Sequence, residues 1–335
     1  MKEFEGNQIL LLCPPFFGYE KEIVSKLESF GAEVQYIEDH PTEFYITLVE
    51  VMQRLGANRG WFVKQYENSV LRKIGLKKFD KVLLINGPYL TSRFTSIIRK
   101  KHLKSKDSKM VLYYWDSLKN TNDDRIRWND FDDVIVFEDK DYQENKGRVR
   151  FLPLFYCDKF WITEHRLSEY DVMIIGSFNL NRYNYVKDLE LNNPDVKVGS
   201  YLYHSKWGIA FHKIFRSKYN HVKYEDLRYK RLSFQEVVDL YAKSNAVFDN
   251  PMLGQQGLTI RTIESLAMHK KLITTNENVK EYDFYNSNDI FVLSSGSKVL
   301  PNKEWYNTPY TVSDETIKHY SIGSWLLKLF NYDND

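Results

Sequence analysis

Short apolar segments alternate with helical patterns from one end of the chain to the other, and this alternation constrains the fold more than any other feature. The predicted strands are Ile9–Cys13, Glu33–Ile37, Lys81–Asn86, Met110–Trp115, Asp133–Phe137, Val149–Leu152, Asp171–Ile175, Val196–Tyr201, Ala246–Asp249, Lys271–Thr275 and Ile290–Leu293. Helical patterns separate most of these strands, and Ser233 with Glu236 predicts a capping box at the start of one helix. Because strands that alternate with helices form parallel sheets, we predict an α/β protein.

The alternation runs through two cycles, which predicts two domains. Residues 1–155 form the first domain, 156–169 a linker, 170–312 the second domain, and 313–335 a C-terminal helix that crosses back to the first. Open parallel sheets bind their ligands beyond the carboxyl ends of the strands. We therefore expect two parallel-sheet domains that face one another across a cleft, with the functional site in that cleft.

Charge and composition exclude several classes of protein. The formal net charge is +2, so nothing global indicates a nucleic-acid partner. The segment 69–109 is locally basic, which is typical of a solvated face or of a surface that contacts anionic lipids. We recognise no signal peptide and no apolar segment long enough to span a membrane. We expect a cytoplasmic protein that lies peripherally on the inner face of the plasma membrane through 69–109.

The segment Ala246–Asn276 is the most informative part of the chain, and its pattern is strand, glycine-bearing loop, helix and strand. Gly254 and Gly257 permit a close backbone approach, and Thr259 can cap the helix that follows. Arg261 is expected in the first turn of that helix, where a cation opposes the helix dipole. A diphosphate bound by the helix amides and by Arg261 removes this conflict. The pattern therefore indicates a diphosphate site.

Glu264 lies one helical turn after Arg261 on the same predicted face. A carboxylate at this place can accept hydrogen bonds from both hydroxyls of a ribose. The alternative is a plain surface ion pair between Arg261 and Glu264, which the same spacing also favours.

The letters GQQGLTIRTIESLAMHKKLITTN, which continue into ENVKEYDFYNSNDIFVL, resemble the donor-binding module of bacterial glycosyltransferases that build capsule, exopolysaccharide and lipopolysaccharide. The shared pattern is Q-x-G-L-T-x-R-T-x-E, followed by K-K-L-I-T-T-N and Y-D-F-Y-N, and weaker matches are DVMIIGSFNLNR, YYWDSLKN and VFEDKDY. The resemblance implies the GT-B fold of two Rossmann-like domains. It also implies a nucleotide-sugar donor, by base rate a UDP-sugar, and a glycan or lipid-linked acceptor. No metal or other cofactor is expected.

The resemblance also implies donor-binding residues in the second domain. They are Gly176, Ser177, Arg182, Gln256, Gly257, Leu258, Thr259, Arg261 and Glu264. In the family, the residue at Glu264 holds the ribose, and the residue at Arg261 lies beside the phosphates. Many retaining GT-B enzymes carry a glutamate where this chain has Gln256, so the resemblance leaves open whether transfer retains or inverts the sugar configuration.

Side chains that follow the strands of the first domain are candidates for acid–base chemistry. Asp116 is the candidate base for inverting transfer, and Glu138 is a weaker one, because each follows a predicted strand at its carboxyl end. Capping of the next helix is the alternative role of both residues. The loop with Phe17, Gly18 and Tyr19 is expected on the acceptor side, although packing between domains explains its aromatic rings equally well.

Other classes of protein fit the sequence less well. His204 and His212 lack a third ligand, and we interpret the acidic stretch 122–133 as a solvated loop. A nucleotide-sugar epimerase of GT-B architecture is the alternative enzyme, but we see no dense cluster of acids and histidines for it. A non-catalytic nucleotide-sugar-binding protein is the other alternative. A dehydrogenase is disfavoured because the first strand leads into CPPFFGYE rather than a Gly-x-Gly-x-x-Gly turn.

Overall fold

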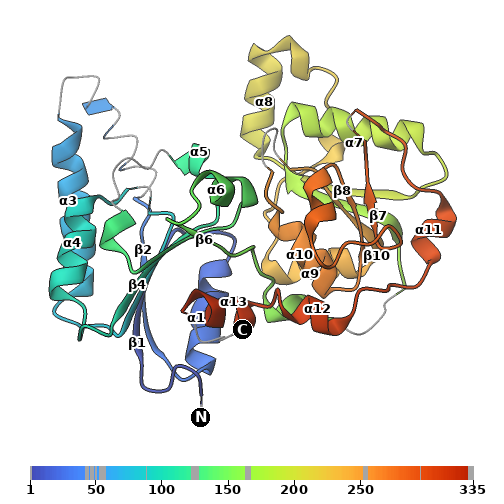
Figure 1. The fold of residues 1–335 in the computed structure, drawn as a ribbon. Coiled ribbons are helices and arrows are strands. Elements are labelled where there is room, and N and C mark those ends of the chain that lie inside the picture. Colours follow the sequence, from blue (N-terminus) through green and yellow to red (C-terminus); the bar gives the residue numbers. More distant parts are fainter. Residues whose placement is uncertain are drawn as a thin grey trace. The chain divides into compact units, whose positions relative to one another are not determined.

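A computed structural model describes residues 2–41, 45, 49, 51–52, 58–87, 89–121, 128–162, 167–251, 256–294 and 296–330. The chain forms two compact units (Figure 1). Unit 1 comprises Met1–Leu154 and Ile322–Asp335, and unit 2 comprises Phe155–Ser321.

Over its described residues, unit 1 is built on a parallel sheet with the strand order β2-β1-β3-β4-β5-β6. The strands are β1 (Gln8–Cys13), β2 (Glu33–Glu38), β3 (Lys81–Ile85), β4 (Lys109–Tyr114), β5 (Asp133–Val136) and β6 (Arg150–Phe151). The helices are α1 (Tyr19–Ser29), α3 (Arg59–Ile74), α4 (Ser92–Lys101), α5 (Leu118–Thr121), α6 (Asp139–Glu144) and α13 (Ile322–Leu329), with a 3-10 turn at Trp128–Asp130. The predicted strands of this half are confirmed.

Apolar side chains on both faces of the unit 1 sheet explain why helices cover both. Figure 1 shows α3 and α4 on one face, and α1 and α13 on the other. The Trp325 ring of α13 is 1% exposed and meets the Tyr113 ring edge-on at a centroid distance of 5.0 Å. Arg150 donates a hydrogen bond to the Lys328 carbonyl near the end of the helix at 2.9 Å. The C-terminal helix is therefore part of the core of unit 1.

The described part of unit 2 contains a second parallel sheet, with the order β12-β11-β10-β7-β8-β9. Its strands are β7 (Tyr170–Ser177), β8 (Val198–Tyr203), β9 (Leu227–Arg228), β10 (Ser244–Asp249), β11 (Lys271–Thr274) and β12 (Ile290–Val292). Its helices are α7 (Leu180–Asn192), α8 (Lys206–Phe215), α9 (Phe234–Ala242), α10 (Ile260–Ala267), α11 (Lys303–Asn307) and α12 (Asp314–Lys318). Short 3-10 turns lie at Asp158–Phe160, Ser217–Tyr219, Tyr224–Asp226 and Glu277–Glu281. Because β7 comes first in the unit and pairs with β10, the strand order reverses between them, and ligands of open sheets bind beside such a reversal.

Two predictions about helices have opposite outcomes. The capping box is confirmed: the Ser233 hydroxyl accepts from the Glu236 amide, and the Glu236 carboxylate accepts from the Ser233 amide. The single helix expected near 313–329 is wrong, because α12 ends at Lys318 and α13 begins at Ile322. Between them, Ser321 bridges to Tyr156, which interrupts the helical hydrogen bonding.

The basic segment 69–109 does not form one continuous face. It runs through α3, β3, α4 and the start of β4, and Lys81 is only 8% exposed. Several of its cations have acidic partners: Arg93 with Glu67 at 2.8 Å, Arg99 with Asp132 at 3.1 Å and Lys104 with Asp80 at 2.6 Å. These pairs reduce the positive charge that the segment offers to an anionic surface.

Candidate functional site

The carboxyl ends of β7 and β10 bring together the residues that open the two halves of unit 2. Gly176 and Ser177 end β7, and Asn179 caps α7 by accepting from the Arg182 amide at 2.8 Å. The Arg182 guanidinium folds back to donate to the Ser177 carbonyl. A Cβ atom at Gly176 would lie 3.1 Å from Arg182 Nη1, so the glycine leaves room for this guanidinium.

Asp249 ends β10 directly opposite this turn and is 1% exposed. Its Oδ2 accepts from the Thr259 hydroxyl at 2.7 Å and from the Thr262 hydroxyl at 3.2 Å. Its Oδ1 is buried without a hydrogen-bond partner. Burial raises the pKa of the Asp249 carboxyl, although Arg261 and the two threonines oppose the rise. Asp249 therefore ties the first turn of α10 to the sheet.

Two arginines from different elements, Arg182 and Arg261, lie beside Asp249 and line one small pocket with it. Burial lowers the pKa of Arg182, and the charge of Arg261 lowers it further, while Asp249 acts in the opposite direction. Arg261 is in the first turn of α10, as predicted, and both arginines are half-buried. Two cations held near a single carboxyl group leave a positive surplus at this edge, which suits an anion.

Thr259 occupies the N-cap position of α10, but its side chain makes no capping hydrogen bond. The prediction that Thr259 caps this helix is therefore right about position and wrong about the bond, because the hydroxyl is drawn to Asp249 instead. A helix start without a capping side chain keeps its amide groups available to another acceptor.

Asparagines that sequence reasoning missed hold the turn before α10. Asn276 Nδ2 donates to the carbonyls of Gln256 and Gly257, each at 3.1 Å, and Asn278 Nδ2 donates to the Gln256 carbonyl at 3.0 Å. Leu258, next in the turn, is 1% exposed and packs into the unit. Both asparagines lie in the segment singled out from the sequence, and their place just after a predicted strand was the available signal. Gly254, also predicted here, lies outside the described residues.

Glu264 lies in the middle of α10 and is 4% exposed. Burial raises the pKa of its carboxyl group well above the usual value. The whole stretch 262–267 of this eight-residue helix is buried, so the alternative of a surface ion pair with Arg261 is wrong. A buried carboxyl group is costly unless something uses it.

Unit 1 places Asp116 at the carboxyl edge of its sheet, just after β4. Asp116 Oδ2 accepts from Asn86 Nδ2 at 3.2 Å, and Asn86 Oδ1 accepts from the Trp115 amide at 3.1 Å. Desolvation raises the pKa of Asp116, and the Asn86 hydrogen bond opposes the rise. The alternative role as a helix cap is filled elsewhere, because Asp141 Oδ2 accepts from the Leu118 amide at the start of α5. Asp116 is thus exposed and oriented by Asn86.

The other predicted residues of unit 1 differ in accessibility. Glu138 is 2% exposed and occupies the N-cap position of α6 without a capping side-chain bond. Phe17 is 67% exposed and Tyr19 only 4%. Phe17 and Gly18 both have left-handed backbone angles, with φ of 51° and 93°, which turn the Phe17 ring outward before α1 begins. Of this loop, Phe17 therefore offers its ring to solvent, whereas Tyr19 belongs to the core.

The described residues contain no group of three or more His, Cys, Asp or Glu side chains placed to hold a metal ion. Of the acidic stretch 122–133, the part 122–127 lies outside the described residues, and Asp130 accepts from the Thr95 hydroxyl at 2.5 Å. Among the described residues, no helix is long and apolar enough to cross a bilayer.

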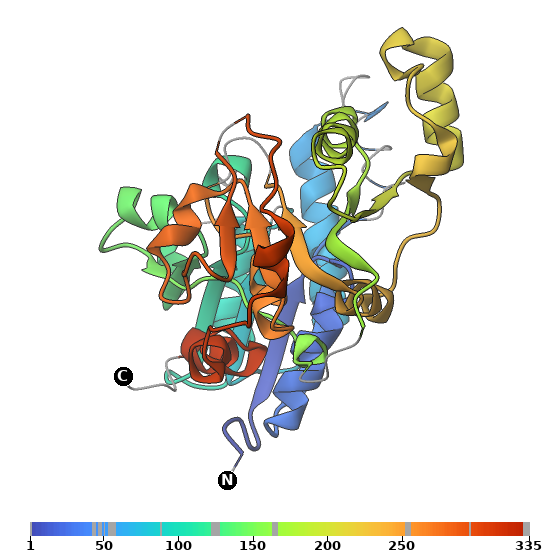
Figure 2. The same ribbon diagram turned by 90° about the vertical axis from the view of Figure 1, so that its right-hand side faces the viewer.

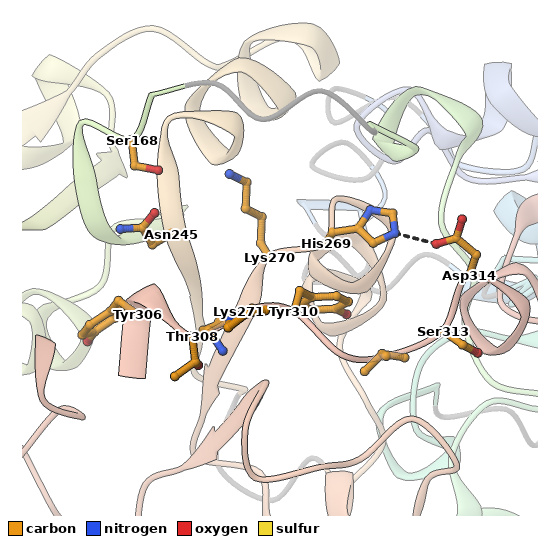
Figure 3. A pocket seen from close by; sticks show the side chains of 12 residues that line it. Ser168, Asn245, His269, Lys270, Lys271, Tyr306, Thr308, Tyr310, Ser313 and Asp314 are labelled. Atoms are coloured by element: carbon orange, nitrogen blue, oxygen red, sulfur yellow. Dashed lines mark hydrogen bonds and ion pairs between the residues drawn. The ribbon is translucent and has the colours of Figure 1, made fainter. Parts of the chain in front are cut away.

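A cavity of about 710 Å³ lies at the amino edge of the unit 2 sheet, away from the strand ends described above (Figure 3). Burial lowers the pKa of Lys270 to about 8, and its ammonium donates to the Ala242 carbonyl at 3.1 Å. His269 Nε2 lies 2.9 Å from an Asp314 carboxylate oxygen. These pairings occupy the charged lining groups, so the arginine pair at the carboxyl edge is the stronger candidate site.

No family model matches the sequence, and no curated protein sequence is significantly similar to it. Solved structures do match over nearly the whole chain. A glycosyltransferase from Rickettsia africae has 13% identity and a TM-score of 0.57, covering 98% of this chain and 99% of that one. HepE from Anabaena, solved with UDP and glucose, has 9% identity and a TM-score of 0.57, covering 97% and 99%. Sucrose-phosphate synthase from Thermosynechococcus elongatus has 9% identity and a TM-score of 0.55, covering 97% and 98%.

This likeness establishes the fold. Both units are Rossmann-like parallel sheets, and the chain has the GT-B fold of these glycosyltransferases. The fold class predicted from the sequence is confirmed.

Proposed function

We propose that this protein is a glycosyltransferase that moves a sugar from a nucleotide-sugar, a UDP-sugar by base rate, to a glycan or lipid-linked acceptor. We further propose that it serves the synthesis of a bacterial surface polysaccharide of the capsule, exopolysaccharide or lipopolysaccharide type. The observation that carries the proposal is the pair Arg182 and Arg261 beside Asp249, at the point of unit 2 where the strand order reverses. A neighbour of the same fold was solved with UDP, which supports a nucleotide donor.

In this proposal the diphosphate of the donor lies against the first turn of α10. Negative charge grows on the leaving diphosphate during transfer, and preorganised cations and helix amides stabilise such charge. Arg261 and Arg182 supply the cations, and the turn Gly257–Thr259 supplies backbone close to the phosphates. Glu264 accepts hydrogen bonds from the ribose hydroxyls, which gives a use to a carboxyl group that is otherwise costly to bury. No metal is needed for these steps.

Asp116 is the proposed general base that takes the proton from the acceptor hydroxyl. It is exposed, it follows a strand at its carboxyl end, and Asn86 orients it. Its raised pKa makes it a better proton acceptor than an ordinary aspartate. Gln256 carries no charge, so it supplies no carboxylate beside the donor sugar. Asp116→Asn should lower kcat far more than it changes KM for the donor, and an equal change in both would contradict this role.

Calorimetry with UDP tests the donor site. Arg261→Ala should weaken UDP binding about 10- to 100-fold, because a charge-assisted hydrogen bond contributes about 1.5–3 kcal/mol. Glu264→Gln should weaken binding of UDP but not of inorganic pyrophosphate, which lacks a ribose. Arg216→Ala is the matched control, since Arg216 is an exposed arginine just beyond α8.

Unchanged UDP affinity in Arg261→Ala would refute the diphosphate site. Thermal stabilisation by a panel of UDP-, GDP-, dTDP- and CMP-sugars identifies the base, because ligands that bind the native state raise Tm. Release of nucleoside diphosphate only in the presence of an acceptor would support transfer, and its release without acceptor would not.

A further inference from the structure

Helix α8 presents large apolar side chains to solvent. Trp207 is 88% exposed, Phe211 55%, Ile214 75% and Phe215 67%. Their spacing of four, three and one residues places all of them on one side of the helix, which we call the α8 apolar face. Figures 1 and 2 both show α8 at the margin of unit 2, outside the layers of its sheet and of α7. An exposed cluster of this kind marks a binding surface.

The opposite side of α8 is packed firmly against unit 2. Ile209 is fully buried, and the His212 ring stacks between the rings of His204, at 5.5 Å, and Tyr219, at 4.7 Å. The His204 ring in turn stacks on Phe178 at 5.1 Å. Because this side is held by a row of stacked rings, the helix cannot rotate to bury the α8 apolar face.

The surroundings of the α8 apolar face are cationic. The segment 204–223 contains Lys206, Lys213, Arg216, Lys218 and Lys223 and no Asp or Glu. Lys206, at the start of the helix, and Arg216 and Lys218, beyond its end, are exposed. Lys213 instead donates to the Val222 carbonyl at 2.7 Å. Exposed cations therefore lie at both ends of the apolar face.

We propose that the α8 apolar face inserts into the headgroup layer of an anionic lipid bilayer. Tryptophan and phenylalanine with flanking lysine and arginine are the composition of helices that lie in this layer. The cations would meet lipid phosphates, for which a surface free of acidic side chains is complementary. A protein partner is the less fitting occupant, since a stable protein interface covers about 800 Å² on each partner and this face is a single projecting helix.

Docking through α8 would act close to the donor site. The helix follows β8 at its carboxyl end, beside β7, whose own end leads to Arg182. Phe178, in the ring stack, lies between Ser177 and Arg182 in the chain. An inserted α8 would thus hold the carboxyl edge of unit 2 near the lipid surface. This step rests on the proposed function, and it favours a lipid-linked acceptor over a free glycan.

Vesicle flotation of the full chain tests the proposal. The protein should bind vesicles of phosphatidylcholine with phosphatidylglycerol at least tenfold more tightly than vesicles of phosphatidylcholine alone, and salt should weaken this binding. The double variant Trp207→Ser/Phe211→Ser should lose at least tenfold in vesicle binding. Its Tm and UDP affinity should stay unchanged, because both side chains are exposed. Leu76→Ser and Leu191→Ser are matched controls, since these leucines are 98% and 80% exposed.

Three results would overturn the proposal. The first is wild-type protein that ignores anionic vesicles, or a double variant that floats like the wild type. The second is a loss of vesicle binding in Leu76→Ser, which would move the contact to the 69–109 segment. The third is an oligomer, seen by sedimentation, that the double variant dissociates, because the face would then join copies of this chain. UDP binding is measured in the same proteins, so failure of the donor site and failure of lipid docking are separate outcomes.

Discussion

Replacement of Asp289 by Asn tests how unit 2 holds the loop that follows α11. The Asp289 carboxylate is fully buried, and its Oδ2 accepts from the Thr311 amide at 2.8 Å, the Thr311 hydroxyl at 2.6 Å and the Val312 amide at 3.1 Å. Its Oδ1 lies 3.4 Å from the Lys271 ammonium, whose side chain is 4% exposed. Asp289→Asn removes the charge and turns an NH₂ group toward groups that can only donate.

We expect this variant to lose about 3–5 kcal/mol of stability, the usual cost of breaking a buried ion pair. For a domain of this size about 1 kcal/mol corresponds to 2–4 °C, so Tm should fall by about 10 °C. Burial alone would raise the pKa of Asp289, but the Thr311 and Asn286 hydrogen bonds and Lys271 lower it overall. The wild-type advantage should therefore be complete above the unfolded pKa of about 3.9 and disappear as pH falls through the lower folded value.

Thermal and urea unfolding followed by circular dichroism measure the effect. Asp188→Asn is the matched control, because its ion pair with Lys298 spans 3.4 Å between side chains that are 53% and 26% exposed, and such pairs contribute about 0–1 kcal/mol. The double variant Lys271→Met/Asp289→Asn should recover part of the loss, since it leaves no buried charge unpaired. A cost below about 1 kcal/mol for Asp289→Asn at pH 7 would refute the reasoning.

Three further predictions follow from single positions. Gly176→Ala should keep the fold but weaken UDP binding, because the new Cβ would lie 3.1 Å from Arg182 Nη1 and displace that guanidinium; equal affinity by calorimetry would contradict this. Asp39→Asn should raise Tm at pH 7 and not near pH 3, since burial raises the pKa of this fully buried carboxyl group and folding must then neutralise it; a lower Tm at pH 7 would be the opposite result. Ser233→Ala should cost about 1 kcal/mol by removing the N-cap of α9, and urea unfolding that shows no loss would mean that the capping box is not stabilising.

Local pattern was enough to predict the elements of this protein. Apolar runs bounded by polar turns identified strands such as β1 and β10, and the start of α10 followed from Thr259 and Arg261. Boundaries shifted where neighbours compete for the same groups: Thr259 gave up its capping bond because Asp249 accepts its hydroxyl. The predicted C-terminal helix became α12 and α13 because Tyr320 and Ser321 pair with Tyr156, which no periodicity announces.

By itself, the sequence determined the α/β class, the parallel sheets and the likeness to a donor-binding module, because these depend on residue periodicity and on residues close together in the chain. Only the tertiary structure decided that β7 lies beside β10, which brings Arg182 and Arg261 to the same carboxyl group. It also decided that Glu264 is buried and that the apolar side of α8 is exposed. Strand order and the exposure of a helix face depend on which distant segments pack together. A residue's local pattern shows which face is apolar, but not whether another part of the chain covers it.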